Sequence, residues 1–141
     1  EKEKQKDSFF MKKFKFPKTQ KLKSEKSINE LFEKGHSLSL PPLRVLWKLN
    51  SDTSSSLPKA AFSASKKIFK RAVDRNLLKR RLREAYRQNK EILLMNSSKL
   101  PAGLEIMFLY TSHEIQPYHN IESSLIALLK LLNGKIKKAK S

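Results

Sequence analysis

The sequence lacks cysteine altogether, which excludes disulfide bonds, thiolate catalysis and cysteine-based zinc sites. Glycine is also scarce, and none of the three glycines falls in the most basic stretch, so that stretch is not a glycine-rich phosphate loop. No apolar run approaches the roughly 18 residues of a membrane-spanning helix. Acidic residues are few as well, since 13 of them stand against 31 lysines and arginines, for a formal charge of +18. A charge of this size indicates a polyanionic partner.

The length of 141 residues predicts one domain, which at this size buries about two-thirds of the surface of the unfolded chain. The N-terminus is charged and lacks the apolar core of a signal peptide, so we expect a cytoplasmic protein. We divide the chain into a flexible basic N-terminal arm (residues 1–21), one folded domain (22–134) and a basic C-terminal tail (135–141).

The most basic stretch runs from Phe62 to Arg87 and holds ten lysines and arginines against two acids, Asp74 and Glu84. Helical spacing places four apolar side chains on a stripe that would face a core: Leu78, Leu82, Ala85 and Tyr86. Cations recur every four residues along a ridge beside this stripe: Arg71, Arg75, Lys79, Arg83 and Arg87. Each like-charge pair at this spacing costs a helix about 0.2–0.5 kcal/mol. Such a helix favours polyanion binding, with a merely solvated basic face as the alternative.

The segment before this stretch combines one short helical pattern with two strand patterns. Residues 22–35 predict a helix capped by Ser24 or Ser27 and ended by Gly35 in the left-handed conformation. Its apolar face would comprise Ile28, Leu31 and Phe32. Alternating apolar residues predict strands at 43–49, which Pro41 and Pro42 would start, and at 59–65.

The remaining elements complete an α/β pattern. The central helix would run from Ala72 to Asn89 or beyond, and a nearly all-apolar run predicts an interior strand at 104–110. A final helix would begin near Pro117 and stop at Gly134. The order of elements predicts an α/β fold, a small single-domain, two-layer sandwich of one sheet with helices packed on it.

Candidate catalytic groups are sparse. The three histidines lack metal-ligand spacing and have no cluster of acids around them: His36, His113 and His119. We therefore expect no catalytic residue and no metal site in the protein itself. Arginine and lysine suit phosphate groups, and Asn76 beside them offers both a donor and an acceptor. Phe32 and Trp47 are either core residues or stacking platforms for unpaired nucleotides.

The segment SASKKIFKRAVDRNLLKRRLREAYR resembles the signature of the bacterial ribonuclease P protein subunit family, and a weaker likeness spans about residues 22–132. The strand end matches at Ser63, Ser65, Lys66 and Lys67. The helix matches at Ala72, Val73, Arg75, Asn76, Lys79, Arg80, Arg83, Glu84, Ala85 and Tyr86. One position departs from the family pattern, because the third residue of an Arg-Asn-Arg triplet is Leu77 here. Arg81, where the family commonly has an apolar residue, could supply the missing cation from a different face.

The resemblance implies a ribosomal-protein-like sandwich with a small mixed sheet and a left-handed βαβ crossover through the long basic helix, against the usual right-handed rule. It also implies the protein component of ribonuclease P, the endonuclease that matures the 5′ end of tRNA. The RNA subunit would carry out the hydrolysis with Mg²⁺ bound mainly to it. The partners would be that RNA subunit, in a 1:1 complex with a monomeric protein, and precursor tRNA.

Carried onto this chain, the resemblance implies two surfaces in a ribonuclease P protein-like RNA-binding domain. A cleft for the 5′ leader of precursor tRNA would include Phe32, Trp47 and Lys79. The RNA-binding residues would be Lys66, Lys67, Arg71, Arg75, Asn76, Lys79, Arg80 and Arg83. Two other functions share the charge and size: a structural ribosomal protein that binds ribosomal RNA, and a self-sufficient metal-dependent nuclease. The absence of a carboxylate cluster in the sequence argues against the nuclease.

Overall fold

The computed structural model describes residues 21–49, 58–94 and 103–140. The predicted N-terminal arm therefore lies outside the described residues, apart from Lys21. The described elements follow one another in this order: α2 (Glu25–Lys34), β1 (His36–Leu40), β2 (Leu43–Leu49), β3 (Lys59–Ala64), α3 (Ala72–Asn89), α4 (Glu91–Leu94), β4 (Leu104–Tyr110) and α5 (Tyr118–Lys140).

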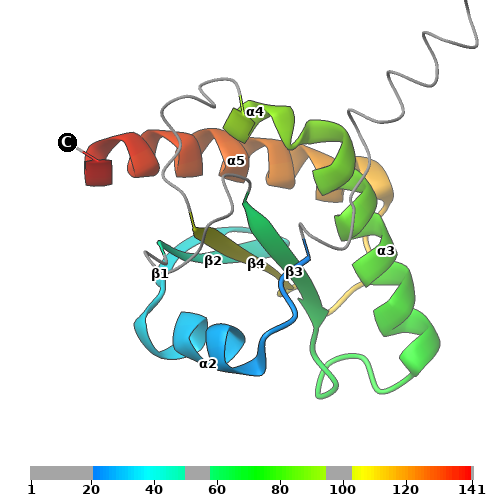
Figure 1. The fold of residues 1–141 in the computed structure, drawn as a ribbon. Coiled ribbons are helices and arrows are strands. Elements are labelled where there is room, and N and C mark those ends of the chain that lie inside the picture. Colours follow the sequence, from blue (N-terminus) through cyan, green and yellow to red (C-terminus); the bar gives the residue numbers. More distant parts are fainter. Residues whose placement is uncertain (1–20, 50–57, 95–102, 141) are drawn as a thin grey trace, which may run out of the picture.

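One four-stranded sheet with the order β1-β2-β4-β3 carries the fold. β1, β2 and β4 pair antiparallel, whereas the edge strand β3 runs parallel to β4. The chain leaves β3, passes through α3 and α4, and returns as the neighbouring strand β4. In Figure 1, β3 lies in front of β4 and this connection passes on the side of α5, so the crossover is left-handed, as the resemblance implied.

The two sides of the sheet carry clusters of buried residues of different size. On the side of α3 and α5, one large cluster joins strand residues such as Val45 and Phe108 to Leu82 of α3 and Leu125 of α5. On the opposite side, which α2 covers (Figure 1), the buried cluster comprises Leu22, Leu31, Leu46 and Met107. The interior strand predicted at 104–110 is confirmed, because β4 is buried along nearly its whole length.

Strand β1 is missing from the sequence-based prediction, which placed Pro41 and Pro42 at the start of a strand. The two prolines instead form the turn between β1 and β2, whose register runs from His36 opposite Trp47 to Leu40 opposite Leu43. The sequence HSLSL does alternate, but its leucines are only partly buried. A short, polar edge strand gives a weak pattern, and it forms because β2 is available to pair with it.

Gly35 ends α2 as predicted, but its conformation is extended (φ −71°, ψ 153°) and not left-handed. Its N–H donates to the carbonyl oxygen of Leu31 at 3.0 Å, and a Cβ placed on Gly35 would lie 2.4 Å from that oxygen. Glycine is therefore required by a close approach of the backbone and not by a positive φ. At the other end of α2, the hydroxyl of Ser24 accepts from the N–H of Ser27 at 3.3 Å, which identifies Ser24 as the cap.

The final helix does not stop at Gly134 as predicted, because α5 continues to Lys140. Residues 135–140 of the predicted tail are therefore helical. Ile136 is 2% exposed and belongs to the large core cluster, so continuing the helix buries apolar surface. This burial outweighs the cost of an interior glycine in a helix, which is about 1 kcal/mol.

Candidate RNA-binding site

The loop between β3 and α3 presents two of the predicted RNA-binding residues, Lys66 and Lys67, with exposed side chains. The loop is held by its own hydrogen bonds. The hydroxyl of Ser65 accepts from the N–H of Lys67 at 3.1 Å, and the carbonyl oxygen of Ser65 accepts from the N–H of Phe69 at 2.9 Å. Phe69 is buried in the large core cluster and anchors the loop to the domain. The two lysines therefore project from a fixed support.

Arg75, another of the predicted RNA-binding residues, forms hydrogen bonds to the backbone of the basic loop. Its Nη1 donates to the backbone carbonyl oxygens of Phe69 at 2.7 Å and Lys70 at 2.9 Å, and the side chain is half-buried. The guanidinium therefore fastens the start of α3 to the basic loop. The guanidinium has further N–H donors beyond these two hydrogen bonds.

The basic side of α3 is formed by Asn76, Lys79, Arg80 and Arg83. At 100° per residue these four positions fall within about 100° of one another around the helix, whereas Asp74 and Glu84 lie outside that arc. Asn76, Arg80 and Arg83 are exposed and Lys79 is half-buried. Within the described part of the chain, none of the three cations forms an ion pair. Arg71, the N-cap residue of α3, is also exposed and lies where the helix joins the loop that carries Lys66 and Lys67.

The last cation of the ridge, Arg87, does not belong to this surface. It donates to both carboxylate oxygens of Glu84, at 3.0 Å and 2.5 Å. These hydrogen bonds lower the pKa of the Glu84 carboxyl and raise the pKa of Arg87. Arg81 likewise has a structural partner, because its guanidinium donates to the carbonyl oxygen of Gln116 at 2.7 Å, which ties α3 to the segment before α5. Arg81 therefore lies outside the arc formed by Asn76, Lys79, Arg80 and Arg83, with one of its donors bound to the backbone.

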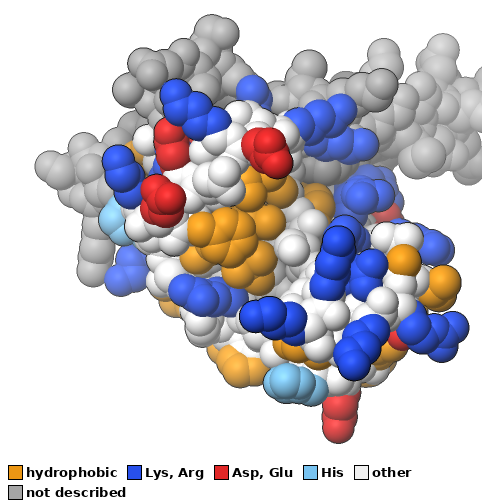
Figure 2. All heavy atoms as spheres, turned by 90° about the horizontal axis from the view of Figure 1, so that it is seen from below, with side chains coloured by type: hydrophobic (Ala, Val, Ile, Leu, Met, Phe, Trp, Pro, Cys, Tyr) orange, Lys and Arg blue, Asp and Glu red, His pale blue; other side chains and the backbone are white. Residues whose placement is uncertain are grey.

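An apolar pocket of about 340 Å³ lies on the α2 side of the sheet, next to the basic loop. It is lined by Phe32, Ser63, Ser65, Ile68, Leu109, Tyr110 and Thr111. Figure 2 views this side and shows apolar side chains gathered in the middle of the face, with lysines and arginines beside them. Phe32 is 57% exposed, so its ring is available for stacking. The sequence pointed to Phe32 and to the Ser63/Ser65 pair, but not to the neighbouring strand end that completes the pocket.

The hydroxyls of the pocket have defined orientations. Thr111 Oγ1 donates to the carbonyl oxygen of Pro42 at 3.0 Å, which leaves its oxygen lone pairs as acceptors. The Tyr110 hydroxyl donates to the carbonyl oxygen of Glu114 and accepts from the N–H of Gln116, while its ring packs on Phe69 in the large core cluster. The Ser65 hydroxyl accepts from the N–H of Lys67 in the loop. The pocket thus combines one apolar platform with a few hydrogen-bonding groups.

The three residues predicted for the leader cleft do not come together. Trp47 points to the opposite side of the sheet from Phe32, is 4% exposed and belongs to the large core cluster. Its ring stacks on His36 at a centroid distance of 4.6 Å. A buried indole offers no free face to a nucleotide, so of the two predicted aromatic platforms only Phe32 is accessible. Alternation along β2 decides this outcome, because Trp47 shares a face with Val45.

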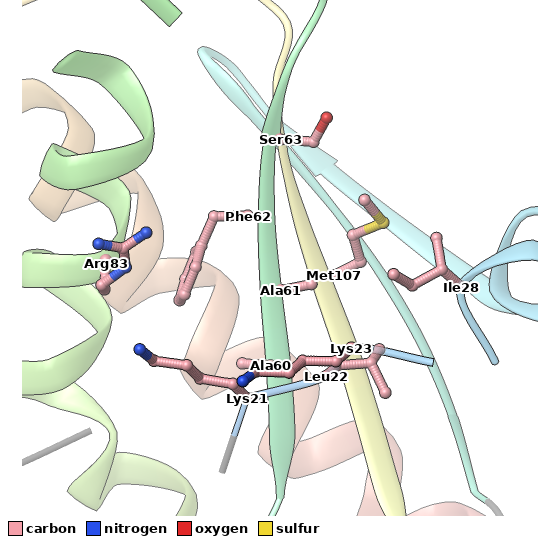
Figure 3. Close-up of a pocket in the computed structure, with 10 residues that line it drawn as sticks. All are labelled: Lys21, Leu22, Lys23, Ile28, Ala60, Ala61, Phe62, Ser63, Arg83 and Met107. Carbon is pink, nitrogen blue, oxygen red and sulfur yellow. The ribbon is translucent and has the colours of Figure 1, made fainter. Parts of the chain in front are cut away.

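A second groove runs along the edge strand β3, at its other end from the pocket. Figure 3 shows Arg83 from α3 and Lys21 on one side of β3, with Ile28 and Met107 on the other. Lys21 pairs with Ala60, and the N–H of Leu22 donates to the carbonyl oxygen of Ala60 at 2.9 Å. Ser63 lines both the groove and the pocket. The two hollows therefore adjoin along β3.

Polar links also join α2 to the sheet. Lys48 on β2 donates to Glu30 on α2, and its Nζ lies 3.9 Å from a carboxylate oxygen of Glu105 on β4. The hydrogen bond and charge of Lys48 hold the pKa of the Glu30 carboxyl below its usual range. These three residues lie on the α2 side of the sheet, together with the pocket.

Among the residues that the structure describes, no three His, Asp or Glu side chains gather closely enough to hold a metal ion. None of the helices described is long and apolar enough to cross a membrane.

A small α/β domain with a cationic surface beside an apolar pocket is the arrangement expected of an RNA-binding protein. Comparison with known proteins identifies the family. The family model for ribonuclease P matches residues 16–132. The chain is 32% identical over 123 residues to the ribonuclease P protein component of Porphyromonas gingivalis, covering 87% of this chain and 90% of that protein. It is 31% identical over 120 residues to that of Citrifermentans bemidjiense, covering 85% and 94%.

Solved structures share the fold. The RNase P protein from Thermotoga maritima matches with a TM-score of 0.62 and 24% identity, covering 79% of this chain and 96% of that one. The RNase P protein of Staphylococcus aureus matches with a TM-score of 0.59 and 23% identity, covering 80% and 94%. The chain therefore belongs to the ribonuclease P protein family. This membership supports the predicted ribonuclease P subunit and not the structural ribosomal protein.

Proposed function

We propose that this protein binds the RNA subunit of ribonuclease P and the 5′ leader of precursor tRNA, and so assists the endonucleolytic maturation of the tRNA 5′ end. Family membership supports the ribonucleoprotein role. One structural observation supports the assignment of the RNA subunit and the leader to two different surfaces. The cationic surface of α3 and its loop directly adjoins an apolar pocket with an exposed aromatic ring. One surface suits folded RNA and the other suits an unpaired strand.

The cationic surface binds the RNA subunit in this proposal. Its members are Lys66, Lys67, Arg71, Asn76, Lys79, Arg80 and Arg83, with Arg75 holding the loop in place. Lysine and arginine neutralise phosphates and release counterions, which is a sequence-independent source of affinity. The absence of competing ion pairs within the described residues leaves Lys79, Arg80 and Arg83 available for this purpose.

The pocket holds the leader. An unpaired base stacks on Phe32, and the hydroxyls of Ser65 and Thr111 hydrogen-bond to its edge or to the sugar. Double-stranded RNA cannot enter a pocket of this size, so the site favours precursor over mature tRNA. Trp47 takes no part, because it is buried in the core.

In the mechanism that follows from this proposal, the protein binds and positions the RNA subunit and the substrate and takes no direct part in the chemistry. The RNA subunit performs the hydrolysis with Mg²⁺ bound mainly to RNA, and the protein supplies neither nucleophile nor general acid. Its cations reduce repulsion between phosphates of the RNA subunit and the substrate, which lowers the Mg²⁺ concentration required. One protein molecule binds one RNA subunit.

Reconstitution tests the proposal. The protein is mixed with a bacterial ribonuclease P RNA at low Mg²⁺, and cleavage of precursor tRNA is followed with and without it. We expect faster cleavage and tighter binding of precursor than of mature tRNA, with saturation at one protein per RNA. If the protein leaves precursor tRNA cleavage unchanged, the proposal fails.

The cationic surface has its own test. Replacing Lys79 and Arg83 by alanine should weaken binding to the RNA subunit and flatten its salt dependence by roughly one unit per lost phosphate contact. Lys130→Ala is the matched control, since it removes an exposed cation from a different helix, α5. An unchanged salt slope in the double variant would place the interface elsewhere.

A further inference from the structure

Little apolar surface holds α2 against the sheet. Leu31 is the one fully buried side chain of this helix, all of which is described, and Ile28 is partly packed against the small cluster. A helix of ten residues has little stability of its own and depends on such packing. Phe32 forms the α2 wall of the pocket, so its position depends on that of α2.

A line of three charges joins α2 to the sheet. Lys48 donates to Glu30 on α2, while its Nζ also lies 3.9 Å from Oε1 of Glu105 on β4. Glu105 is 3% exposed, and this Oε1 accepts no hydrogen bond from the described residues. A buried carboxylate without close partners is unfavourable. Movement of the Lys48 ammonium toward Glu105 would therefore strengthen the Lys48–Glu105 ion pair and break the Lys48–Glu30 hydrogen bond.

We propose that Lys48 is a positioning residue with two alternative partners, and that exchange between them sets the position of the α2 wall of the pocket. When Lys48 bonds to Glu30, α2 is drawn to the sheet and Phe32 stands over the pocket. When Lys48 bonds to Glu105, α2 is released and the space between α2 and β3 widens to admit a single strand. The inference rests on the proposed function, because the strand admitted is the leader.

Arg44 makes a useful contrast on the same strand and the same face. It donates to Ser37 of β1 at 2.9 Å and is exposed, so its partner lies within the sheet. Lys48 instead connects two separate elements, a helix and the sheet, through charges of which one is buried. Only the second arrangement can couple the position of a helix to the choice of partner.

Hydrogen exchange of the full chain tests the two-partner arrangement. Glu30→Gln weakens the bond to Lys48, so exchange at residues 28–34 should become about two- to fivefold faster, as expected for loss of a partly exposed ion pair. Glu105→Gln removes the second partner, so the same amides should exchange more slowly. Glu33→Gln is the matched control on the same helix, exposed and without an ion pair, and should change nothing. If Glu30→Gln behaves like Glu33→Gln, or if Glu105→Gln accelerates exchange, the inference is wrong.

Binding to the reconstituted ribonucleoprotein connects this exchange to the leader. The quantity measured is the ratio of affinities for precursor and mature tRNA. It should fall about two- to fivefold in Glu30→Gln and in Lys48→Met, because α2 then stays released and Phe32 is no longer held over the pocket once the strand has entered, and Lys48→Arg should restore it. Arg44→Met is the control for loss of a cation from β2.

The two proposals fail in different ways. A wild-type protein that does not discriminate between precursor and mature tRNA overturns the proposed function. A wild-type protein that discriminates, together with Glu30→Gln and Lys48→Met variants that discriminate equally well, overturns only the role of Lys48. Glu30→Gln keeps the buried Lys48–Glu105 pair, so it remains informative if Lys48→Met does not fold.

Discussion

The two sides of the sheet serve different purposes, and the difference is visible in what each one buries. Among the described residues, the side of α3 and α5 gathers 21 buried side chains into one cluster, whereas the α2 side gathers four. The first side supplies the hydrophobic stabilisation of the domain. The second side leaves a pocket and an exposed phenylalanine, which a purely structural layer would cover. The α2 layer has few buried contacts and rests on a sheet that α3 and α5 stabilise from the other side. Such a layer can move enough to admit a ligand.

Trp47→Ala should produce the largest effect, and on stability alone. The indole lies in the large core cluster, and removing a buried large aromatic side chain lowers the free energy of unfolding by about 3–5 kcal/mol. Urea denaturation of the isolated protein measures it. Leu49→Ala on the same strand, 39% exposed, should stay within about 0.5 kcal/mol. A stable Trp47→Ala variant that has lost leader discrimination would instead make Trp47 a binding residue.

Phe32→Ala should show the opposite pattern. Its ring is exposed, so unfolding should change by no more than about 0.5 kcal/mol. Loss of one stacked base should cost about 1–3 kcal/mol in binding of precursor tRNA, with mature tRNA unaffected. Leu131→Ala, an exposed apolar residue on α5, is the control for both measurements. Equal losses for precursor and mature tRNA would remove Phe32 from the leader site.

Substitution of two glycines on opposite sides of the sheet should change stability by smaller amounts and in opposite directions. Gly134 lies inside α5, and Gly35 ends α2. Gly134→Ala should stabilise the protein by about 0.5–1 kcal/mol, because α5 continues through this position and no atom lies within 4 Å of the added Cβ. Gly35→Ala should destabilise it, because the Cβ would meet the carbonyl oxygen of Leu31. Thermal unfolding of the two variants compares them directly. A destabilised Gly134→Ala would contradict the continuous helix.

The smallest effect concerns pH, since each side of the sheet has one carboxyl whose pKa is lowered by a hydrogen-bonded cation: Glu30 with Lys48 and Glu84 with Arg87. A lowered folded-state pKa gives stability that is present above the unfolded value, near 4.3, and is lost as the pH falls through the folded value. Glu84→Gln should therefore lower stability at pH 7 by less than about 1 kcal/mol, and the difference should shrink below about pH 4. A difference that grew on acidification would contradict the assignment.

Local sequence patterns were reliable wherever one face of an element was strongly apolar. The central helix, the interior strand and the strand containing Trp47 formed where predicted. Prediction failed where the pattern was weak or where distant packing decided the result. β1 forms because β2 offers a partner, and α5 passes Gly134 because Ile136 finds the core.

The candidate site divides in the same way. The exposed cations of α3 and its loop were predictable because helical spacing separates them from the buried stripe. The pocket was not, since it joins residues from α2, β3, β4 and the following loop that are far apart in sequence. Arg75 and Arg81 were also beyond prediction, because their hydrogen bonds are to backbone carbonyl oxygens of other segments.

The sequence by itself determined the charge, the basic helix, its family signature and hence the class of partner, because composition and periodicity are local properties of the chain. The tertiary structure alone decided which aromatic ring is exposed, since Phe32 on α2 remains 57% exposed whereas Trp47 on β2 packs into the large core cluster. It also decided which cations are occupied and which are available. Burial and partner choice depend on chain segments brought together by folding, and these are not encoded in any single stretch.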